Sequence, residues 1–261
     1  MDMQLKGKNI LVTASSRGIG KAIAEQLAKE GANLILCSRS EEQLLELASS
    51  LQTQYGIEAV GRKVDLSSRT SIDELIAWLH TSCPTLDGLV CNTGGPPKGN
   101  LMTLDEQDWA DAFQLQLMSI VRLIKGCLPL LAVNGGNILT IASSSVKQPI
   151  PGLLLSNTFR TAVAGFMKSI ASECAEQRVL VNTLCPGRIA TDRIAELDHS
   201  LAAETSQSIE VIQAQFERAI PLGRYGQPQE LAAFAAFLLS PLNSYMTGSA
   251  FLFDGGMVQA L

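Results

Sequence analysis

Residues 9–20 read NILVTASSRGIG, a short apolar run followed by a glycine-containing turn and the start of an amphipathic segment. An apolar run of this length is typical of a buried parallel strand. Gly18 and Gly20 let the backbone turn tightly and approach a pyrophosphate, while the following helix offers free N–H groups and positive potential. The stretch therefore predicts a strand, a phosphate-binding turn and a helix, as at the start of a dinucleotide-binding domain.

The alternation of strand and helix continues along the chain. The predicted strands are Asn9–Ala14, Asn33–Cys37, Ala59–Val64, Gly88–Cys91, Asn137–Ala142, Leu180–Cys185 and Ala250–Phe253. Helical periodicity predicts Ile19–Glu30, Glu41–Gln54, Ser71–Thr81, Leu104–Leu131, Leu155–Ala175 and Gln229–Leu239. This order predicts an α/β fold of the Rossmann type, with a doubly wound parallel seven-stranded sheet and helices on both faces. Functional residues are expected where the strands end.

Length and composition favour one domain. The chain has 261 residues, 46% of them hydrophobic and 17% charged, and no stretch resembles a linker. We therefore expect residues 1–261 to form a single Rossmann-fold domain. Residues 192–221 depart from the alternation of strand and helix. They are polar at first, and their periodicity then predicts a helix from Ser208 to Ala219. We interpret them as a lid over a substrate, with a plain surface excursion as the alternative.

Charge and cysteine content exclude several classes of function. A net charge of −5 disfavours nucleic-acid binding, which needs a concentrated basic surface. The six cysteines form no CxxC pair and the chain has two histidines, so we expect reduced, packed thiols and no metal site. The N-terminus has no secretory signal pattern, and no segment approaches about 18 uninterrupted apolar residues. These features predict a cytoplasmic protein that acts on a small molecule and does not bind membranes.

Several motifs, in their order along the chain, resemble the short-chain dehydrogenase/reductase family, and within it the 3-oxoacyl-(acyl-carrier-protein) reductases. Residues 13–20 are similar to the fingerprint T-G-x-x-x-G-x-G, with Ala14 in place of the first glycine. Residues 92–95, NTGG, resemble the family's N-N-A-G segment, and residues 185–191, CPGRIAT, resemble its nicotinamide loop. The match continues to the DGG at residues 254–256. The resemblance thus covers nearly the whole chain. The small methyl of Ala14 is expected to adjust the turn slightly without loss of binding.

This resemblance implies an NADP(H) site. The cofactor-binding residues are then Thr13, Ser15, Ser16, Arg17, Gly18, Ile19, Gly20, Ser38, Arg39, Asp65, Leu66, Asn92, Gly94, Pro186, Gly187, Ile189 and Thr191. NAD enzymes usually place an acidic residue after the second strand, where it accepts hydrogen bonds from the ribose. Here the chain has Ser38 and Arg39, and we expect Arg39 and Arg17 to pair with a 2′-phosphate. NADPH is therefore the predicted cofactor.

The family's catalytic residues are present only in part. Ser143 follows the fifth strand, as the family serine does. Where the family has Tyr-x-x-x-Lys, this chain has Ser156 and Arg160, and Gln116 occupies the place of the family asparagine. The tyrosines of the chain are Tyr55, Tyr225 and Tyr245, so none lies between residues 56 and 224. The usual proton donor is therefore missing.

The replacements limit the chemistry. An aliphatic hydroxyl has a far higher pKa than a phenol, so Ser156 is a poor general acid. Arg160 can hydrogen-bond a ribose or clamp a substrate carboxylate or enolate, and with Ser143 and Ser156 it can stabilise negative charge on an oxygen. Lys98 and Lys147 are candidate replacement acids, with plain surface lysines as the alternative.

Three functions remain open from the sequence. The favoured one is an NADPH-dependent reductase of a carbonyl or an activated double bond, with a proton from water, the substrate or Lys147. The alternatives are a non-redox isomerase or lyase on the same scaffold, and a catalytically inactive nucleotide-sensing or interaction protein. By resemblance, the helices at 104–131 and 155–175 also imply a homodimer or homotetramer.

Overall fold

Seven parallel strands form the centre of the protein. The structure is a computed structural model that describes residues 2–260. The strands lie in the order β3-β2-β1-β4-β5-β6-β7, and every neighbouring pair is parallel. Their bounds are β1 Asn9–Thr13, β2 Asn33–Ser38, β3 Ala59–Lys63, β4 Gly88–Cys91, β5 Gly136–Ile141, β6 Val179–Pro186 and β7 Ala250–Phe253. The predicted sheet is confirmed, and each predicted strand end lies within one residue of the observed end.

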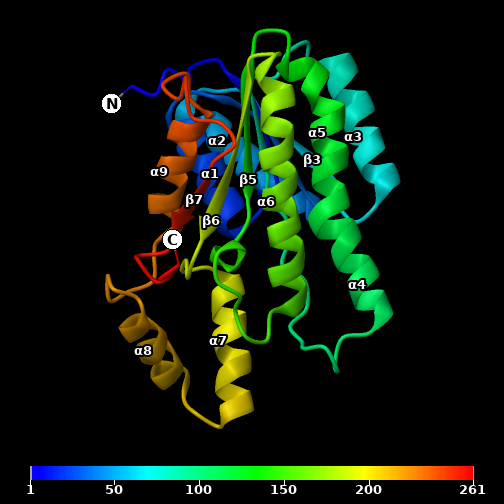
Figure 1. The fold of residues 1–261 in the computed structure, drawn as a ribbon. Coiled ribbons are helices and arrows are strands. Elements are labelled where there is room, and N and C mark those ends of the chain that lie inside the picture. Colours follow the sequence, from blue (N-terminus) through cyan, green and yellow to red (C-terminus); the bar gives the residue numbers. More distant parts are fainter. Residues whose placement is uncertain (1, 261) are drawn as a thin grey trace.

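Helices cover both faces of this sheet (Figure 1). Helices α1, α2 and α9 share one apolar core with the sheet, and α3, α5 and α6 share another. The helices are α1 Gly18–Lys29, α2 Glu41–Tyr55, α3 Arg69–Ser82, α4 Glu106–Ala112, α5 Ser119–Leu131, α6 Leu154–Ala175, α7 Asp192–Thr205, α8 Ile209–Ala219 and α9 Pro228–Leu239, with a π-helical segment η1 Phe113–Met118 and a 3-10 turn η2 Ser144–Val146.

The two cores explain why the strands read as short apolar runs. Ile10 and Val12 of β1 face the core under α1, α2 and α9, whereas Leu11 between them faces the core under α3, α5 and α6. Side chains alternate along a strand, so a strand covered on both faces is apolar at successive positions. The sheet changes direction of winding at β1 and β4, which places a ligand crevice at the carboxyl ends of these strands.

The predicted helix Leu104–Leu131 is divided in the structure. It begins after Asp105, whose carboxylate accepts the N–H of Asp108 at 2.9 Å while the Asp108 carboxylate accepts the N–H of Asp105 at 3.1 Å. This reciprocal cap fixes the start of α4. The helix then widens into η1 at Phe113–Met118 before it continues as α5. Such π-helical bulges often occur at functional sites.

The same stretch is the only part of residues 2–260 that is long and apolar enough to cross a membrane, Glu106–Leu131. Its apolar side chains on α5 are engaged inside the protein. They pack with α3 and the sheet in one core and include Ile120, Leu123, Ile124 and Cys127. The hydrophobicity of this segment is therefore that of a core helix.

Helices α7 and α8 extend beyond the carboxyl edge of the sheet (Figure 1). The helix predicted from Ser208 to Ala219 is confirmed as α8. For the residues of helix α7, by contrast, the sequence predicts only a polar segment. Its buried side chains are Asp198 and Ala202. A helix that buries so little apolar surface gives a weak periodic signal, and this is why the sequence did not reveal it.

Candidate active site

The turn between β1 and α1 has the backbone geometry of a phosphate-binding loop. Ala14 and Gly18 have φ angles of +47° and +57°, a region that only glycine adopts freely. A Cβ on Gly20 would collide with the carbonyl oxygen of Ala14 and lie 2.8 Å from Nδ2 of Asn92. Ala14 therefore has the left-handed backbone that a glycine adopts freely at such a turn.

Thr13 joins the end of β1 to the end of β4. Its hydroxyl donates to the carbonyl oxygen of Asn92 at 2.8 Å and accepts the Asn92 N–H at 2.9 Å. The Asn92 side chain donates in turn to the carbonyl oxygen of Ala14 at 3.3 Å. Ser15 is buried, and its N–H donates to the carbonyl oxygen of Cys37 at 3.0 Å. These residues thus hold three strand ends together beneath the turn.

Two arginines border the crevice, one in the turn after β1 and one directly after β2. Arg17, the N-cap of α1, and Arg39 are both exposed, and neither forms an ion pair within the part of the chain that the structure describes. Asp65 accepts hydrogen bonds from the hydroxyl and the N–H of Ser67 at 2.7 and 2.9 Å. The Ser67 hydroxyl is the largest cause of the lowered pKa of Asp65, and the positive charge of Arg39 adds to it. Arg39 therefore lies near Asp65 and remains available to a ligand.

The loop after β6 faces the glycine turn. The N–H of Gly187 donates to the carbonyl oxygen of Phe253 at 2.9 Å and fixes the loop to β7. The hydroxyl of Thr191 donates to the carbonyl oxygen of Ile189 at 3.2 Å. A Cβ on Gly18 would lie 3.7 Å from Cγ2 of Thr191. The two predicted halves of the cofactor site are thus brought together across the crevice.

Arg160 is a buried cation at the end of β5. Its side chain is 6% exposed, and Nη1 donates to the carbonyl oxygen of Ile141 at 2.7 Å. Burial is the main cause that lowers the pKa of Arg160 to about 10, so the guanidinium stays protonated at neutral pH. The positive charge of Arg193 lowers this pKa further, which shows that two cations share the region.

Ser143 and Ser156 lie beside Arg160. Ser143 caps η2, its hydroxyl accepting the N–H of Ser145 at 3.1 Å. Ser156 precedes Arg160 by one turn of α6, so the two share a face of that helix. Burial raises the pKa of the Cys185 thiol to about 11, although the N–H of Ser143 and the charge of Arg160 oppose this. Cys185 therefore lies next to both Ser143 and Arg160, and no sequence motif marks it as a site residue.

Gln116 lies inside the π-helical segment η1 and is fully buried. Its side-chain amide donates a short hydrogen bond to the carbonyl oxygen of Gly94, in the loop after β4. Its Oε1 atom is buried without a hydrogen-bond partner among residues 2–260, as is Oγ1 of Thr93. A Cβ on Gly94 would meet no atom within 4 Å, so space is open next to this loop. The loop presents polar atoms that a ligand could satisfy.

The loop at residues 94–98 also contacts helix α7. Nζ of Lys98 donates to the Ser200 hydroxyl at 2.9 Å and to Glu204 at 3.0 Å. Arg193 donates to the carbonyl oxygen of Pro96 at 2.8 Å. The sequence makes Lys98 a candidate proton donor. In the structure its ammonium is engaged by two partners on α7, so it fastens the helix to the loop.

A polar cluster anchors α7 and α8 to the end of β6, and no sequence motif predicts it. The Arg188 guanidinium lies 3.4 Å from the ring centre of Phe216 on α8 and 5.0 Å from that of Tyr225. It also forms a very short ion pair with the buried carboxylate of Asp198 on α7. The Tyr225 hydroxyl donates to the same carboxylate at 2.9 Å. The three partners come from segments far apart in the chain.

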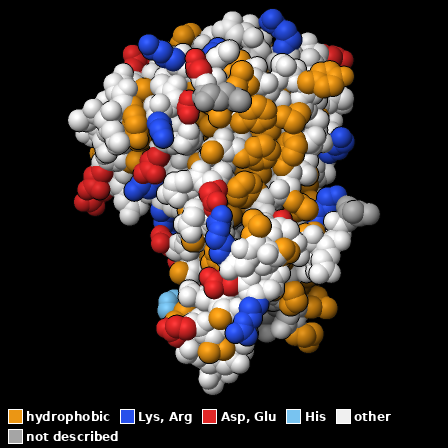
Figure 2. Space-filling view, turned by 90° about the vertical axis from the view of Figure 1, so that its left-hand side faces the viewer, with side chains coloured by type: hydrophobic (Ala, Val, Ile, Leu, Met, Phe, Trp, Pro, Cys, Tyr) orange, Lys and Arg blue, Asp and Glu red, His pale blue; other side chains and the backbone are white. Residues whose placement is uncertain are grey.

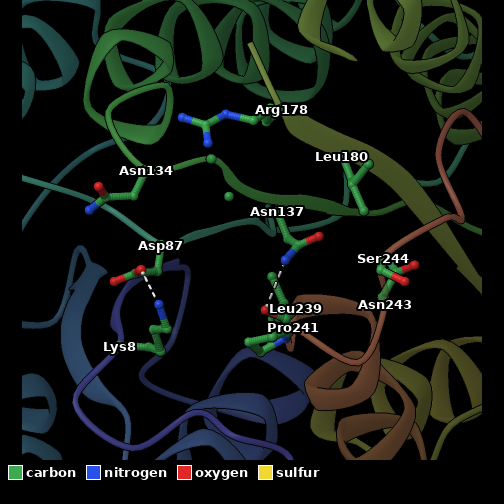
Figure 3. A pocket seen from close by; sticks show the side chains of 12 residues that line it. Lys8, Asp87, Asn134, Asn137, Arg178, Leu180, Leu239, Pro241, Asn243 and Ser244 are labelled. Atoms are coloured by element: carbon green, nitrogen blue, oxygen red, sulfur yellow. Dashed lines mark hydrogen bonds and ion pairs between the residues drawn. The ribbon is translucent and has the colours of Figure 1, made fainter. Parts of the chain in front are cut away.

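A separate depression of about 420 Å³ lies at the opposite edge of the sheet (Figure 3). Nζ of Lys8 and the Asp87 carboxylate form an ion pair there at 2.8 Å, and Asn137 donates to the carbonyl oxygen of Leu239 at 3.1 Å. These residues lie at the amino ends of the strands. Open parallel sheets bind their ligands at the carboxyl ends, so we assign the active site to the Arg160 edge.

Comparison with known proteins agrees with this geometry. Residues 13–258 match the family model described as enoyl-(acyl carrier protein) reductase. The chain is 33% identical over 258 residues to the 3-oxoacyl-(acyl-carrier-protein) reductase FabG of Aquifex aeolicus, covering 98% of this chain and 100% of the relative. It is 35% identical over 257 residues to FabG of Vibrio cholerae, with coverages of 98% and 99%. The chain belongs to the short-chain dehydrogenase/reductase family.

Solved structures of this family superpose closely on the protein. L-sorbose reductase of Gluconobacter frateurii, complexed with NADPH and L-sorbose, has a TM-score of 0.95 and 32% identity, with all of both chains covered. YwfH, an NADPH-dependent reductase involved in bacilysin biosynthesis, has a TM-score of 0.94 and 26% identity, covering 98% of this chain and 100% of its own. The predicted family and Rossmann-type fold are therefore confirmed.

The residues of this chain fit a dinucleotide. The N-terminus of α1 has no side-chain cap, so its N–H groups are free for a phosphate. The buried atoms without partners at Thr93 and Gln116 border the open space beside Gly94. The remaining predicted cofactor residues also lie at this edge, on strand ends, in the turns after strands or in the first turn of α1; they are Ser16, Ile19, Ser38, Leu66 and Pro186.

Proposed function

We propose that the protein is an NADPH-dependent reductase of a carbonyl or an activated double bond. The observation that carries this proposal is the position of Arg160 and Ser143 at the same sheet edge as the dinucleotide turn. Bound NADPH would supply the hydride. The reductases named above support this assignment, as does the NADP found in the structure of a 3-oxoacyl (acyl-carrier-protein) reductase from Agrobacterium tumefaciens.

The proposed catalytic group stabilises negative charge. When a hydride reaches a carbonyl carbon, electrons move to the oxygen, and a preorganised cation and hydroxyls lower the energy of that state. Arg160 supplies the cation, held by its bond to Ile141, while Ser143 and Ser156 supply hydroxyls. Gln116 positions the loop at Gly94 on which the substrate would rest.

The proton must come from elsewhere. Ser156 remains too weak an acid, and Lys98 is engaged by Glu204 and Ser200. Lys147 is exposed at the end of η2, and its charge acts on the pKa of Cys185, which places it near the site. We propose that water, reaching the oxygen beside Lys147, delivers the proton. An exposed proton source is consistent with a site that lacks a buried phenol.

Helices α7 and α8 are proposed to form the lid over this site. Arg193 and Lys98 connect α7 to the loop beside Gly94, and Arg188 connects both helices to the end of β6. A substrate lying between this loop and Arg160 would be shielded from water by α7.

A titration and a turnover assay test the proposed function. Quenching of protein fluorescence would measure NADPH and NADH binding, and NADPH absorbance would report turnover of ketones, oxo acids and conjugated enones. Arg160→Lys is the matched control for Arg160→Met, because it keeps the charge. We expect NADPH binding in all three proteins and turnover lost in Arg160→Met. Binding without any turnover would favour the isomerase or sensing alternatives, and no nucleotide binding would refute the proposal.

Two further expectations stay proposals. Figure 2 shows hydrophobic side chains gathered over the side of the molecule that bears α9 and β7. Phe234, Phe251 and Phe253 form a half-buried ring cluster there, and β7 is an edge strand with an unpaired side. A second copy of the chain could pair with this edge about a two-fold axis. Light scattering would test the proposed homo-oligomer, whose subunits we expect in the cytoplasm.

A further inference from the structure

Arg160 differs from the other cations around the crevice because it is buried and has no acidic partner, whereas the unpaired Arg17, Arg39 and Lys147 are exposed. Lys98 is paired with Glu204, and Arg188 is paired with Asp198. Within residues 2–260, Arg160 forms no ion pair, and its single hydrogen bond leads to a neutral carbonyl oxygen. A buried charge is stable only when it is paired or hydrogen-bonded, so a guanidinium that is 6% exposed and has one neutral partner is poorly compensated.

The charged surroundings of Arg160 increase this imbalance. The groups that act on its pKa besides burial are the Cys185 thiol and the guanidinium of Arg193, and the second is also positive. Arg193 lies over the loop, where a Cβ on Gly95 would be 2.9 Å from its Nε atom. Its acidic neighbour is the exposed Glu196, at 3.8 Å. Lys147 adds a third positive charge next to Cys185.

We propose that the substrate carries a carboxylate and that Arg160 binds it, with Arg193 adding positive charge from the lid. A guanidinium presents a planar fork of N–H donors that matches the two oxygens of a carboxylate. Nη1 is used by Ile141, which leaves the other edge of the fork for a ligand. This inference rests on the proposed reductase and narrows its substrates to oxo acids or unsaturated acids.

The nucleotide does not supply this missing charge. A ribose hydroxyl can accept a hydrogen bond from Arg160 but is neutral. The phosphates of a dinucleotide are expected at the N-terminus of α1, where free N–H groups receive them. A carboxylate on the substrate would pair with the guanidinium directly. The same carboxylate would also attract the guanidinium of Arg193, which lies over the loop.

A binding experiment with simple probes tests the proposal without turnover. Oxalate and oxamide have nearly the same shape, but oxalate is a dianion and oxamide is neutral. Calorimetry would measure both on the free protein and on the protein saturated with NADP. We expect oxalate to bind at least about tenfold more tightly than oxamide, because a buried guanidinium discriminates strongly for charge. Arg160→Met should remove this preference, and Arg160→Lys should retain most of it.

Two controls separate the possible results. Arg178→Met alters an exposed arginine at the amino edge of the sheet, and it should leave the preference unchanged. The melting temperature of Arg160→Met should equal or exceed that of the wild type, because the variant removes a poorly compensated buried charge. Equal binding of oxalate and oxamide, or no binding of either, would overturn the carboxylate assignment. Failure of the wild-type protein to bind NADPH would instead refute the proposed reductase function.

Discussion

The hydroxyl of Tyr225 donates a hydrogen bond to Oδ2 of Asp198, 2.9 Å away, and so completes the pairing of a carboxylate that is 1% exposed. The other oxygen of Asp198 faces Arg188. Tyr225→Phe should therefore lower the free energy of unfolding by about 1 kcal/mol, the usual contribution of one hydrogen bond. Asp198→Asn should cost roughly 3 kcal/mol, because it leaves the Arg188 charge buried and unpaired.

Urea unfolding followed by circular dichroism would measure both changes. Tyr245→Phe is the matched control, since Tyr245 is 94% exposed and should tolerate the change without loss. Equal effects of Tyr225→Phe and Tyr245→Phe would mean that the hydrogen bond to Asp198 does not stabilise the protein.

Ala14 offers a second prediction, because its φ of +47° is strained for any residue with a Cβ. Ala14→Gly should relieve this strain and raise the free energy of unfolding by about 0.5 to 1 kcal/mol. Ala77→Gly, at an exposed position within α3, should instead destabilise the protein by about 1 kcal/mol. Opposite signs for the two variants in the same urea experiment are the expected result. A loss of stability in Ala14→Gly would contradict the left-handed turn.

The turn around Ala14 is also one of the features that can be predicted from the sequence alone. Local backbone geometry requires the glycines, and burial on both faces of the sheet makes the strands apolar. These two features predict the turn and the strands, whose ends lie within one residue of the predicted ones. The family's spacing placed Ser143, Ser156 and Arg160, and the structure brings these residues to one sheet edge.

Other parts of the site depend on contacts between distant segments. The partners Arg188, Asp198 and Tyr225 are separated by 10 and 27 residues, and no local pattern marks a buried aspartate on a polar helix. The π-helical bulge at Gln116 is a change of one hydrogen-bond register within a periodic helix, so periodicity alone predicts a continuous helix. The missing counter-charge of Arg160 is likewise visible only when all its neighbours are known.

Arg39 is exposed, lies close to Asp65 and forms no ion pair within the described residues. Arg39→Ala should weaken NADPH binding by about tenfold and leave NADH binding nearly unchanged, because only NADPH carries the 2′-phosphate. Arg69→Ala is the control, since Arg69 is also exposed but pairs with Asp73 on α3. Parallel fluorescence titrations would measure the affinities of the wild type and of both variants for NADPH and NADH. A similar loss for NADH would assign Arg39 a structural role.

All six cysteines are buried, and burial raises the pKa of each thiol. The thiolate is the nucleophile that attacks an alkylating reagent, so native protein at about pH 8 should react slowly and unfolded protein fast. Cys185 has the pKa of about 11, and its thiolate fraction should rise roughly tenfold per pH unit up to that value. Mass spectrometry after timed alkylation would report the rate at each cysteine.

The charge of Arg160 determines in which direction the alkylation rate of Cys185 should change in a variant. The positive charge of Arg160 favours the Cys185 thiolate, while burial opposes it more strongly. Arg160→Met should therefore slow alkylation of Cys185 still further at a fixed pH, whereas Cys37 and Cys91, whose thiols Arg160 does not influence, should react as in the wild type. Rapid alkylation of Cys185 in the native protein near neutral pH would show that the arginine outweighs burial. Cys185 would then be a reactive thiolate next to Ser143 and would have to be included in the chemistry of the site.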